Sequence, residues 1–261
     1  MVRVSKEAAI ISALVRRVSG VGRVRLDRSA AAIHVGNWLS MTTFANDGNV
    51  KPTEPHSLGS RRVGWFGGSF DPVHIGHLWI AEAAREQLHL DEVRFVPAAT
   101  NPLKPGGPQA DDASRLEMLR LATSGNDAFI VDDRELRRGE VSYTVETLRQ
   151  WRSEFPKAKT FLLIGGDSLA DFERWSEPGE ILRLATLAVV RRGGIRELDY
   201  SFIESIADAS VAEEIRHCEI QMPMIELSST EIRQRVRDGQ SIRYRVPAAV
   251  AAMIQNSQPY S

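Results

Sequence analysis

The sequence predicts an α/β fold, a doubly wound parallel sheet of five to six strands with helices on both faces. Two observations lead to this prediction. Short apolar runs alternate with helix-prone segments from residue 62 onward, which is typical of repeated strand-helix-strand units. The run Thr160-Phe161-Leu162-Leu163-Ile164 is continuously apolar, as expected of a central strand that is covered on both faces. Together they indicate a Rossmann-like sheet.

Composition limits the class of protein. The chain has 261 residues, 43% of them hydrophobic, which is ample for the core of one domain. A net charge of −1 gives no reason to expect a nucleic-acid partner. The single cysteine excludes an intrachain disulfide and suits a reducing compartment, and no apolar run is long enough to predict a membrane span. We therefore expect a cytoplasmic protein; the sequence does not predict its oligomeric state.

The first 61 residues differ from the rest. Residues 1–40 carry seven Lys or Arg against two acidic residues, and residues 41–62 are polar and rich in Asn, Pro, Ser and Gly. We expect residues 1–61 to be a disordered N-terminal extension and residues 62–261 to form the functional domain. The basic leader suits either a transit peptide or a dispensable tail ahead of Met41.

The most informative stretch follows the first predicted strand, Val63 to Phe66. It reads Gly67-Gly68-Ser69-Phe70-Asp71-Pro72-Val73-His74-Ile75-Gly76-His77. Asp71-Pro72 predicts a turn and Ile75 a helix start, so His74 and His77 share one face at a helix N-terminus. Glycines, free amides and imidazoles together suit a phosphate. A purely structural turn and a zinc site are the alternatives, although the only cysteine, Cys218, lies in a separate strand-like run.

The next elements continue the alternation. Val93 to Pro97 is a predicted strand, and its glycine-rich loop places Lys104 at the ligand-binding edge, unless it is simply a solvated lysine. A helix is expected over Ser114 to Thr123 and a strand over Phe129 to Val131. A further helix opens at Ser142 with Thr144 near its start.

The central strand is expected to end at the same edge. Gly165, Gly166 and Asp167 follow it, and Asp167 is placed either to accept hydrogen bonds from ribose hydroxyls or to cap the next helix. Trp175 is either core or a stacking surface for a planar ring. Leu187 to Val190 is the fifth predicted strand, followed by a helix-prone segment from Tyr200 to His217.

A second phosphate-binding pattern lies near the C-terminus. Ser228 and Glu231 match a capping box, which predicts a helix start whose amides lie beside the hydroxyls of Ser229 and Thr230. Arg233 follows one turn later, although a plain capped helix is the alternative. A final helix is expected over Ala248 to Ile254.

Two phosphate-binding sites, a ribose-binding acid and a stacking tryptophan describe a pocket for a nucleoside triphosphate beside a second phosphorylated ring. No covalent nucleophile is evident. We therefore expect direct attack of a substrate phosphate on the α-phosphorus of ATP, with the protein supplying alignment and charge stabilisation. Mg²⁺ is expected to arrive with the ATP, and the sequence identifies no metal ligands of its own.

The motifs resemble those of the nucleotidyltransferase superfamily marked by H-x-G-H. Over residues 62 to 255 the chain looks like bacterial nicotinate-nucleotide adenylyltransferases, because G-G-x-F-D-P-x-H-x-G-H, S-Y-T-x-x-T-L, G-x-D-S with a downstream Trp, and S-S-T-x-I-R occur in that order. The resemblance implies adenylyl transfer from ATP to nicotinate mononucleotide, giving deamido-NAD and pyrophosphate. It also implies that Thr144 and the backbone near Trp175 recognise the nicotinate carboxylate while the indole stacks on the pyridine ring.

The expected site is therefore as follows. The catalytic residues are His74, His77 and Arg233. The substrate-binding residues are Gly67, Gly68, Ser69, Phe70, Lys104, Thr144, Gly166, Asp167, Trp175, Ser229 and Thr230.

Two positions depart from the family pattern. Leu103 stands where a histidine is common, and Glu146 where aspartate is common. Both bear on substrate contact and leave open a preference for nicotinamide mononucleotide or another phosphorylated acceptor. A non-catalytic nucleotide-binding module is the alternative of a different class, and retention of both histidines argues against it.

Overall fold

The structure is a computed structural model that describes residues 61–103, 106–192 and 197–260. The predicted N-terminal extension, apart from Arg61, lies outside the described residues, and so does Lys104.

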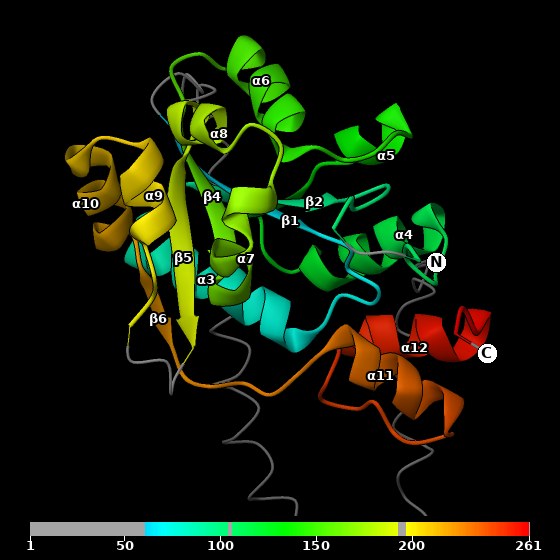
Figure 1. The fold of residues 1–261 in the computed structure, drawn as a ribbon. Coiled ribbons are helices and arrows are strands. Elements are labelled where there is room, and N and C mark those ends of the chain that lie inside the picture. Colours follow the sequence, from blue (N-terminus) through cyan, green and yellow to red (C-terminus); the bar gives the residue numbers. More distant parts are fainter. Residues whose placement is uncertain (1–60, 104–105, 193–196, 261) are drawn as a thin grey trace, which may run out of the picture. The chain divides into compact units, whose positions relative to one another are not determined.

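One six-stranded sheet organises the described residues (Figure 1). Its strands are β1 (Arg62–Gly68), β2 (Glu92–Pro97), β3 (Phe129–Val131), β4 (Lys159–Gly165), β5 (Thr186–Arg192) and β6 (Ile220–Met222). Every neighbouring pair is parallel, and the spatial order is β3-β2-β1-β4-β5-β6. This confirms the predicted doubly wound sheet. The order reverses between β1 and β4, and the carboxyl ends of strands at such a reversal are where sheets of this kind bind ligands.

Both faces of the sheet are covered by helices (Figure 1). On one face pack α3 (Ile75–Gln87), α4 (Asp112–Thr123), α11 (Ser229–Arg237) and α12 (Ala248–Ser257). On the other pack α6 (Thr144–Glu154), α8 (Pro178–Leu184), α9 (Ser201–Ile206) and α10 (Ala209–His217). Strand β4 shows why its sequence is continuously apolar: Phe161 and Leu163 enter the first core and Leu162 and Ile164 the second.

The sequence missed four short elements. These are α5 (Arg134–Arg138), α7 (Gly166–Ala170), the 3-10 helix Phe172–Arg174 and strand β6. The helix-prone segment from Tyr200 to His217 divides into α9 and α10. Cys218 was expected in a strand-like run, but it is the C-cap residue that follows α10, and β6 begins two residues later at Ile220. Elements this short carry too few positions for a periodic pattern, and β3, which is equally short, was predicted from its unbroken apolar run.

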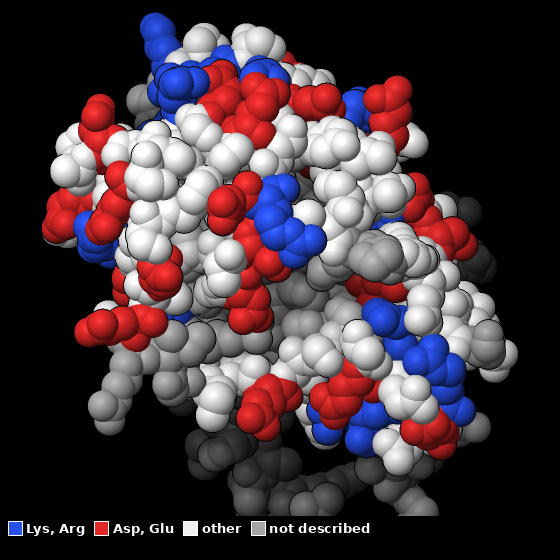
Figure 2. Space-filling model, in the orientation of Figure 1, with Lys and Arg blue, Asp and Glu red and all other residues white. Residues whose placement is uncertain are grey.

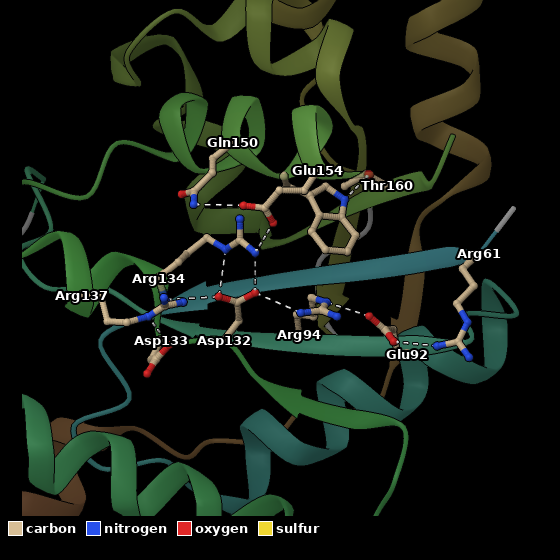
Figure 3. Close-up of polar contacts among 11 residues, drawn as sticks. Arg61, Glu92, Arg94, Asp132, Asp133, Arg134, Arg137, Gln150, Glu154 and Thr160 are labelled. Carbon is tan, nitrogen blue, oxygen red and sulfur yellow. Dashed lines mark hydrogen bonds and ion pairs between the residues drawn. The ribbon is translucent and has the colours of Figure 1, made fainter. Parts of the chain in front are cut away.

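A buried network of charges joins β2 and β3 to α5 and α6 (Figure 3). Asp132, just beyond β3, is 6% exposed and accepts hydrogen bonds from Arg134 Nε at 2.9 Å and Arg94 Nη1 at 3.1 Å. Arg134 Nη2 also donates to Glu154 at the end of α6, at 3.1 Å. Burial opposes ionisation of Asp132, but its hydrogen bonds and ion pairs with Arg134 outweigh burial and lower its pKa below 3.8.

We expect Asp132→Asn to lower the free energy of unfolding by about 3 kcal/mol at pH 7, because it leaves the buried guanidinium of Arg134 and the partly buried one of Arg94 without their shared carboxylate. A carboxyl group whose pKa is lower in the folded than in the unfolded state stabilises the fold at pH values above its unfolded pKa. This stabilisation is lost as the pH falls through the folded pKa. The difference between wild type and variant should therefore shrink as the pH falls below about 4. Denaturant unfolding at pH 7 and pH 3 measures it.

Asp133 is the matched control. It pairs with Arg137, whose side chain is 70% exposed, so Asp133→Asn should change stability by no more than about 0.5 kcal/mol. Equal losses for the two variants would show that the network contributes no more than a surface ion pair.

Candidate active site

Two cavities meet at the carboxyl ends of β1 and β4. The histidine cavity, which His74 and His77 line, has a volume of about 550 Å³. The tryptophan cavity, which Trp175 lines, has a volume of about 520 Å³. Residues from both strand ends line both cavities, so the two share a rim at the point where strand order reverses. The shared residues are Phe66, Gly67, Gly68, Asn101, Gly165, Ser168 and Asp171.

Gly67 and Gly76 leave space that the site uses. A Cβ built on Gly67 would have no heavy atom within 4 Å, so the missing side chain opens the rim of both cavities. A Cβ on Gly76 would lie 3.1 Å from the His74 ring. Glycine between the two histidines therefore lets the imidazole pack against the first turn of α3.

The two histidines form a stacked pair at the N-terminus of α3. Their ring centroids lie 3.6 Å apart with an interplanar angle of 24°, and both rings line the histidine cavity. The backbone N–H of His74 donates to His77 Nδ1 at 3.1 Å. In the neutral imidazole this leaves Nε2 of His77 as the protonated nitrogen. Phe70, which is only 2% exposed, supports the pair with an edge contact to His77 at 5.0 Å.

Arg233 reaches the same cavity from α11. Its Nη1 donates to the carbonyl oxygen of Asp71 at 2.6 Å and lies 3.5 Å from the Asp71 carboxylate. Its Nη2 donates to Thr230 Oγ1 at 3.2 Å, whereas Nε is buried with no hydrogen-bond partner. The structure therefore brings Arg233, His74 and His77 to one cavity, from positions more than 150 residues apart in sequence.

The start of α11 is fixed by hydroxyl groups. Ser228 Oγ accepts from the backbone N–H of Glu231 at 3.1 Å, as predicted, and Ser229 Oγ donates to the carbonyl oxygen of Pro72 at 2.8 Å. The Glu231 carboxylate pairs with Arg245 at 2.9 Å, so the capping box predicted for it is only half formed. Ser229 and Thr230 both line the histidine cavity.

Asp71 has a role that sequence patterning did not suggest beyond a turn. Its buried carboxylate accepts from the backbone N–H groups of Gln109 and Ala110 at 2.7 and 3.1 Å. It thus ties the loop after β2 to Arg233. Burial, and then the charge of Asp71, raises the pKa of the Tyr260 hydroxyl, which stays protonated beside the carboxylate.

The residues after β4 differ in whether they line a cavity. Asp167 is exposed and lines the histidine cavity, whereas Gly166, the first residue of α7, lines neither cavity. The role of Asp167 toward a ribose remains a prediction. Ser168 and Asp171, which the sequence did not single out, line both cavities.

The tryptophan cavity is lined by both aromatic and polar residues. Trp175 packs on Phe172 with centroids 5.4 Å apart, is partly buried, and its Nε1 is buried with no hydrogen-bond partner. The N-terminus of α6 also borders this cavity, and the Tyr143 side chain makes no capping hydrogen bond there. Thr144, Tyr143 and Ser142 all line the cavity at that end.

The local electrostatics favour anions in both cavities. The N-termini of α3 and α11 border the histidine cavity and that of α6 the tryptophan cavity, and each brings the positive end of a helix dipole. At α3 the N–H groups of Ile75 and His77 already donate to the carbonyl oxygens of Arg245 and His74. On the face drawn in Figure 2, basic and acidic side chains are interspersed. Anion binding there depends on these local donors rather than on a broad basic field.

The chemistry of the walls suits a metal ion that arrives with its phosphates. Among residues 61–103, 106–192 and 197–260, no three His, Cys, Asp or Glu side chains form a metal-binding cluster. The carboxylates of the histidine cavity are Asp71, Asp167 and Asp171, and Asp71 already accepts two amide hydrogen bonds. Mg²⁺ bound to nucleotides takes most of its ligands from phosphate and water and one or two from carboxylates, a need that Asp171 on the rim of the cavity would fit.

Comparison with known proteins places the chain in a family. The cytidylyltransferase-like family matches residues 65–235. A protein of Rhodopirellula baltica named "Probable nicotinate-nucleotide adenylyltransferase" is 50% identical over 212 residues, which are 81% of this chain and 98% of that protein. One of the same name from Salinibacter ruber is 43% identical over 198 residues, or 76% of this chain and 97% of that protein.

A solved structure supports the fold. The Plasmodium falciparum nicotinic acid mononucleotide adenylyltransferase complexed with NaAD superposes with a TM-score of 0.60 at 16% identity, covering 77% of this chain and 97% of that one. The shared sheet, the order of the motifs and the identity to both bacterial proteins agree. The chain therefore belongs to the cytidylyltransferase-like family and, within it, to the nicotinate-nucleotide adenylyltransferases.

Proposed function

We propose that this protein transfers the adenylyl group of ATP to nicotinate mononucleotide, forming deamido-NAD and pyrophosphate. The observation that supports this most is the shared rim of two different cavities. The histidine cavity offers imidazole, guanidinium and backbone donors for a triphosphate, and the tryptophan cavity offers an indole and a helix N-terminus for a ring that bears a carboxylate. The bacterial relatives carry the name of this reaction.

The reaction is a direct displacement at phosphorus. A phosphate oxygen of the mononucleotide forms a bond to the α-phosphorus of ATP as the bond from that phosphorus to the bridging oxygen of pyrophosphate breaks. In our proposal His74, His77 and Arg233 stabilise the charge that grows on the phosphate oxygens. Ser229, Thr230 and the first amides of α11 hold the leaving pyrophosphate, with Lys104 as a further predicted phosphate contact. Mg²⁺, when bound, neutralises charge on the triphosphate.

The remaining predicted residues position the two substrates. Asp167, exposed on the cavity wall, accepts hydrogen bonds from the adenosine ribose. Thr144 and the α6 N-terminus receive the nicotinate carboxylate, and the Trp175 ring stacks on the pyridine. Gly67, Gly68 and Ser69 let the phosphates approach the end of β1.

None of the described helices has both the length and the apolar character of a membrane span. We propose that the enzyme acts in the cytoplasm.

The direct test incubates the purified full chain with ATP, Mg²⁺ and one acceptor at a time, and measures pyrophosphate. The acceptors are nicotinate mononucleotide, nicotinamide mononucleotide and phosphopantetheine. We expect the acid to give at least about tenfold higher kcat/KM than the amide, because the α6 N-terminus favours a negative charge. Preference for the amide would reassign the substrate, and no pyrophosphate with any acceptor would indicate a non-catalytic nucleotide-binding protein.

A further inference from the structure

A buried carboxylate in the wall of the tryptophan cavity has no part in the proposed displacement. Glu135 lies on α5, is 7% exposed, and lines the cavity together with Thr147, which is 2% exposed. Burial raises the pKa of Glu135, whereas hydrogen bonds from Thr147 and Ser142 oppose that rise. A carboxylate is costly to bury, so one beside a binding cavity calls for an explanation.

The Thr147 hydroxyl joins Glu135 to a cation. Its Oγ1 donates to Glu135 Oε1 at 2.6 Å and accepts from Arg138 Nη2 at 3.1 Å. Since both the proton and a lone pair of this hydroxyl are engaged, the Thr147 side chain is fixed on two sides. Thr147 lies in the first turn and a half of α6, so α5 holds that part of α6 in place.

The segment leading into α6 is also fixed at the exit of β2. Ser142 Oγ accepts from the backbone N–H of Ala99 at 3.0 Å, and the N–H of Ser142 donates to the carbonyl oxygen of Thr100 at 2.8 Å. Ser142, Tyr143 and Thr144 therefore enter the cavity between two anchors, the exit of β2 and the Glu135–Thr147 pair. The Tyr143 side chain does not cap α6, so these two anchors determine where the first backbone N–H groups of α6 lie.

We propose that Glu135 and Thr147 are positioning residues for the acceptor mononucleotide. They hold the first turn of α6, and with it Tyr143 and Thr144, at the distance from Trp175 that the acceptor ring requires. This inference rests on the proposed function, because it assigns the tryptophan cavity to the acceptor. It predicts that disturbing the pair weakens binding of the acceptor and leaves ATP binding in the histidine cavity unchanged.

Thr147→Val and Thr147→Ser form the test pair. Valine keeps the shape and removes the hydroxyl, whereas serine restores it. We expect Thr147→Val to raise the KM for nicotinate mononucleotide about tenfold while the KM for ATP stays within about twofold of wild type. Thr147→Ser should return the KM for nicotinate mononucleotide to within about threefold of wild type. Glu135→Gln, whose amide oxygen still accepts from Thr147, should give an intermediate rise in the acceptor KM.

A binding measurement separates this inference from the function on which it rests. Quenching of tryptophan fluorescence by nicotinate mononucleotide reports the dissociation constant of each variant without turnover. If the wild-type enzyme is active and folded Thr147→Val binds the acceptor with unchanged affinity, the positioning role alone is overturned. Equal rises in the KM values for ATP and for the acceptor would overturn it as well. Wild type that neither binds nor converts the mononucleotide would remove both proposals.

Discussion

Replacing His77 with asparagine is expected to lower kcat by a factor of about 100 or more while leaving the fold intact. The imidazole faces the histidine cavity at the positive end of α3, where a preorganised donor stabilises charge in the transition state. Removal of one such donor typically costs two to three orders of magnitude in turnover, roughly 2.7–4 kcal/mol. Steady-state pyrophosphate release at saturating ATP and acceptor measures this loss.

A second substitution at the same position separates catalysis from stability. His77 Nδ1 also accepts the backbone N–H of His74, so His77→Ala removes a helix-capping contact that an asparagine oxygen can replace. We expect both variants to lose turnover equally, and only His77→Ala to lose about 1 kcal/mol of unfolding free energy. Turnover that is retained in His77→Asn would mean that the residue caps α3 and does nothing in the reaction.

Replacing Arg233 with glutamine is expected to lower kcat/KM for ATP by roughly 100- to 1,000-fold. The guanidinium lines the histidine cavity, and Nη1 and Nη2 each use one N–H in the bonds to Asp71 and Thr230, so each keeps a second N–H for a phosphate. Arg233→Lys should recover little of the loss, because an ammonium group cannot bond Asp71 and Thr230 and still reach a phosphate.

Arg237 provides the control on the same helix. It lies one turn beyond Arg233, donates to Gln109 from an exposed position, and does not line the histidine cavity. We expect Arg237→Gln to leave kcat/KM for ATP within about twofold of wild type, since surface arginines contribute little. Similar losses in Arg233→Gln and Arg237→Gln would indicate a general effect of charge on α11 instead of a specific phosphate contact.

Much of this arrangement was predictable from sequence because it follows from periodicity and from the ends of strands. Continuous apolar runs predicted β1, β2 and β4. In a parallel sheet the ends of β1 and β4, at Gly68 and Gly165, must then lie at the same edge. The placement of His74 and His77 was also predictable, since a helix N-terminus that follows a strand points toward that edge. The place of Arg233 beside them was expected from the phosphate-binding pattern of Ser228 to Arg233 and not from strand order, because the strand before α11, β6, was not predicted.

The supporting contacts were not predictable, because each joins residues with no local pattern between them. Asp71 binds the amides of Gln109 and Ala110, 38 and 39 residues away, and in sequence it suggested only a turn. Glu135 lies in a five-residue helix that the pattern missed, and its contact with Thr147 depends on how α5 packs on α6. A faint signal existed, since Thr147 belongs to the S-Y-T-x-x-T-L motif, but the motif does not reveal its partner.

Catalysis in this account depends on a triphosphate held by α3 and α11 at once. The most direct measurement is a crystal structure of the full chain with Mg²⁺ and a non-hydrolysable ATP analogue. We predict phosphate oxygens within about 3.2 Å of a ring nitrogen of His74 or His77 and of a guanidinium nitrogen of Arg233 in the same bound molecule. A triphosphate that lies in the tryptophan cavity, or that touches only one of the two helices, would contradict the account.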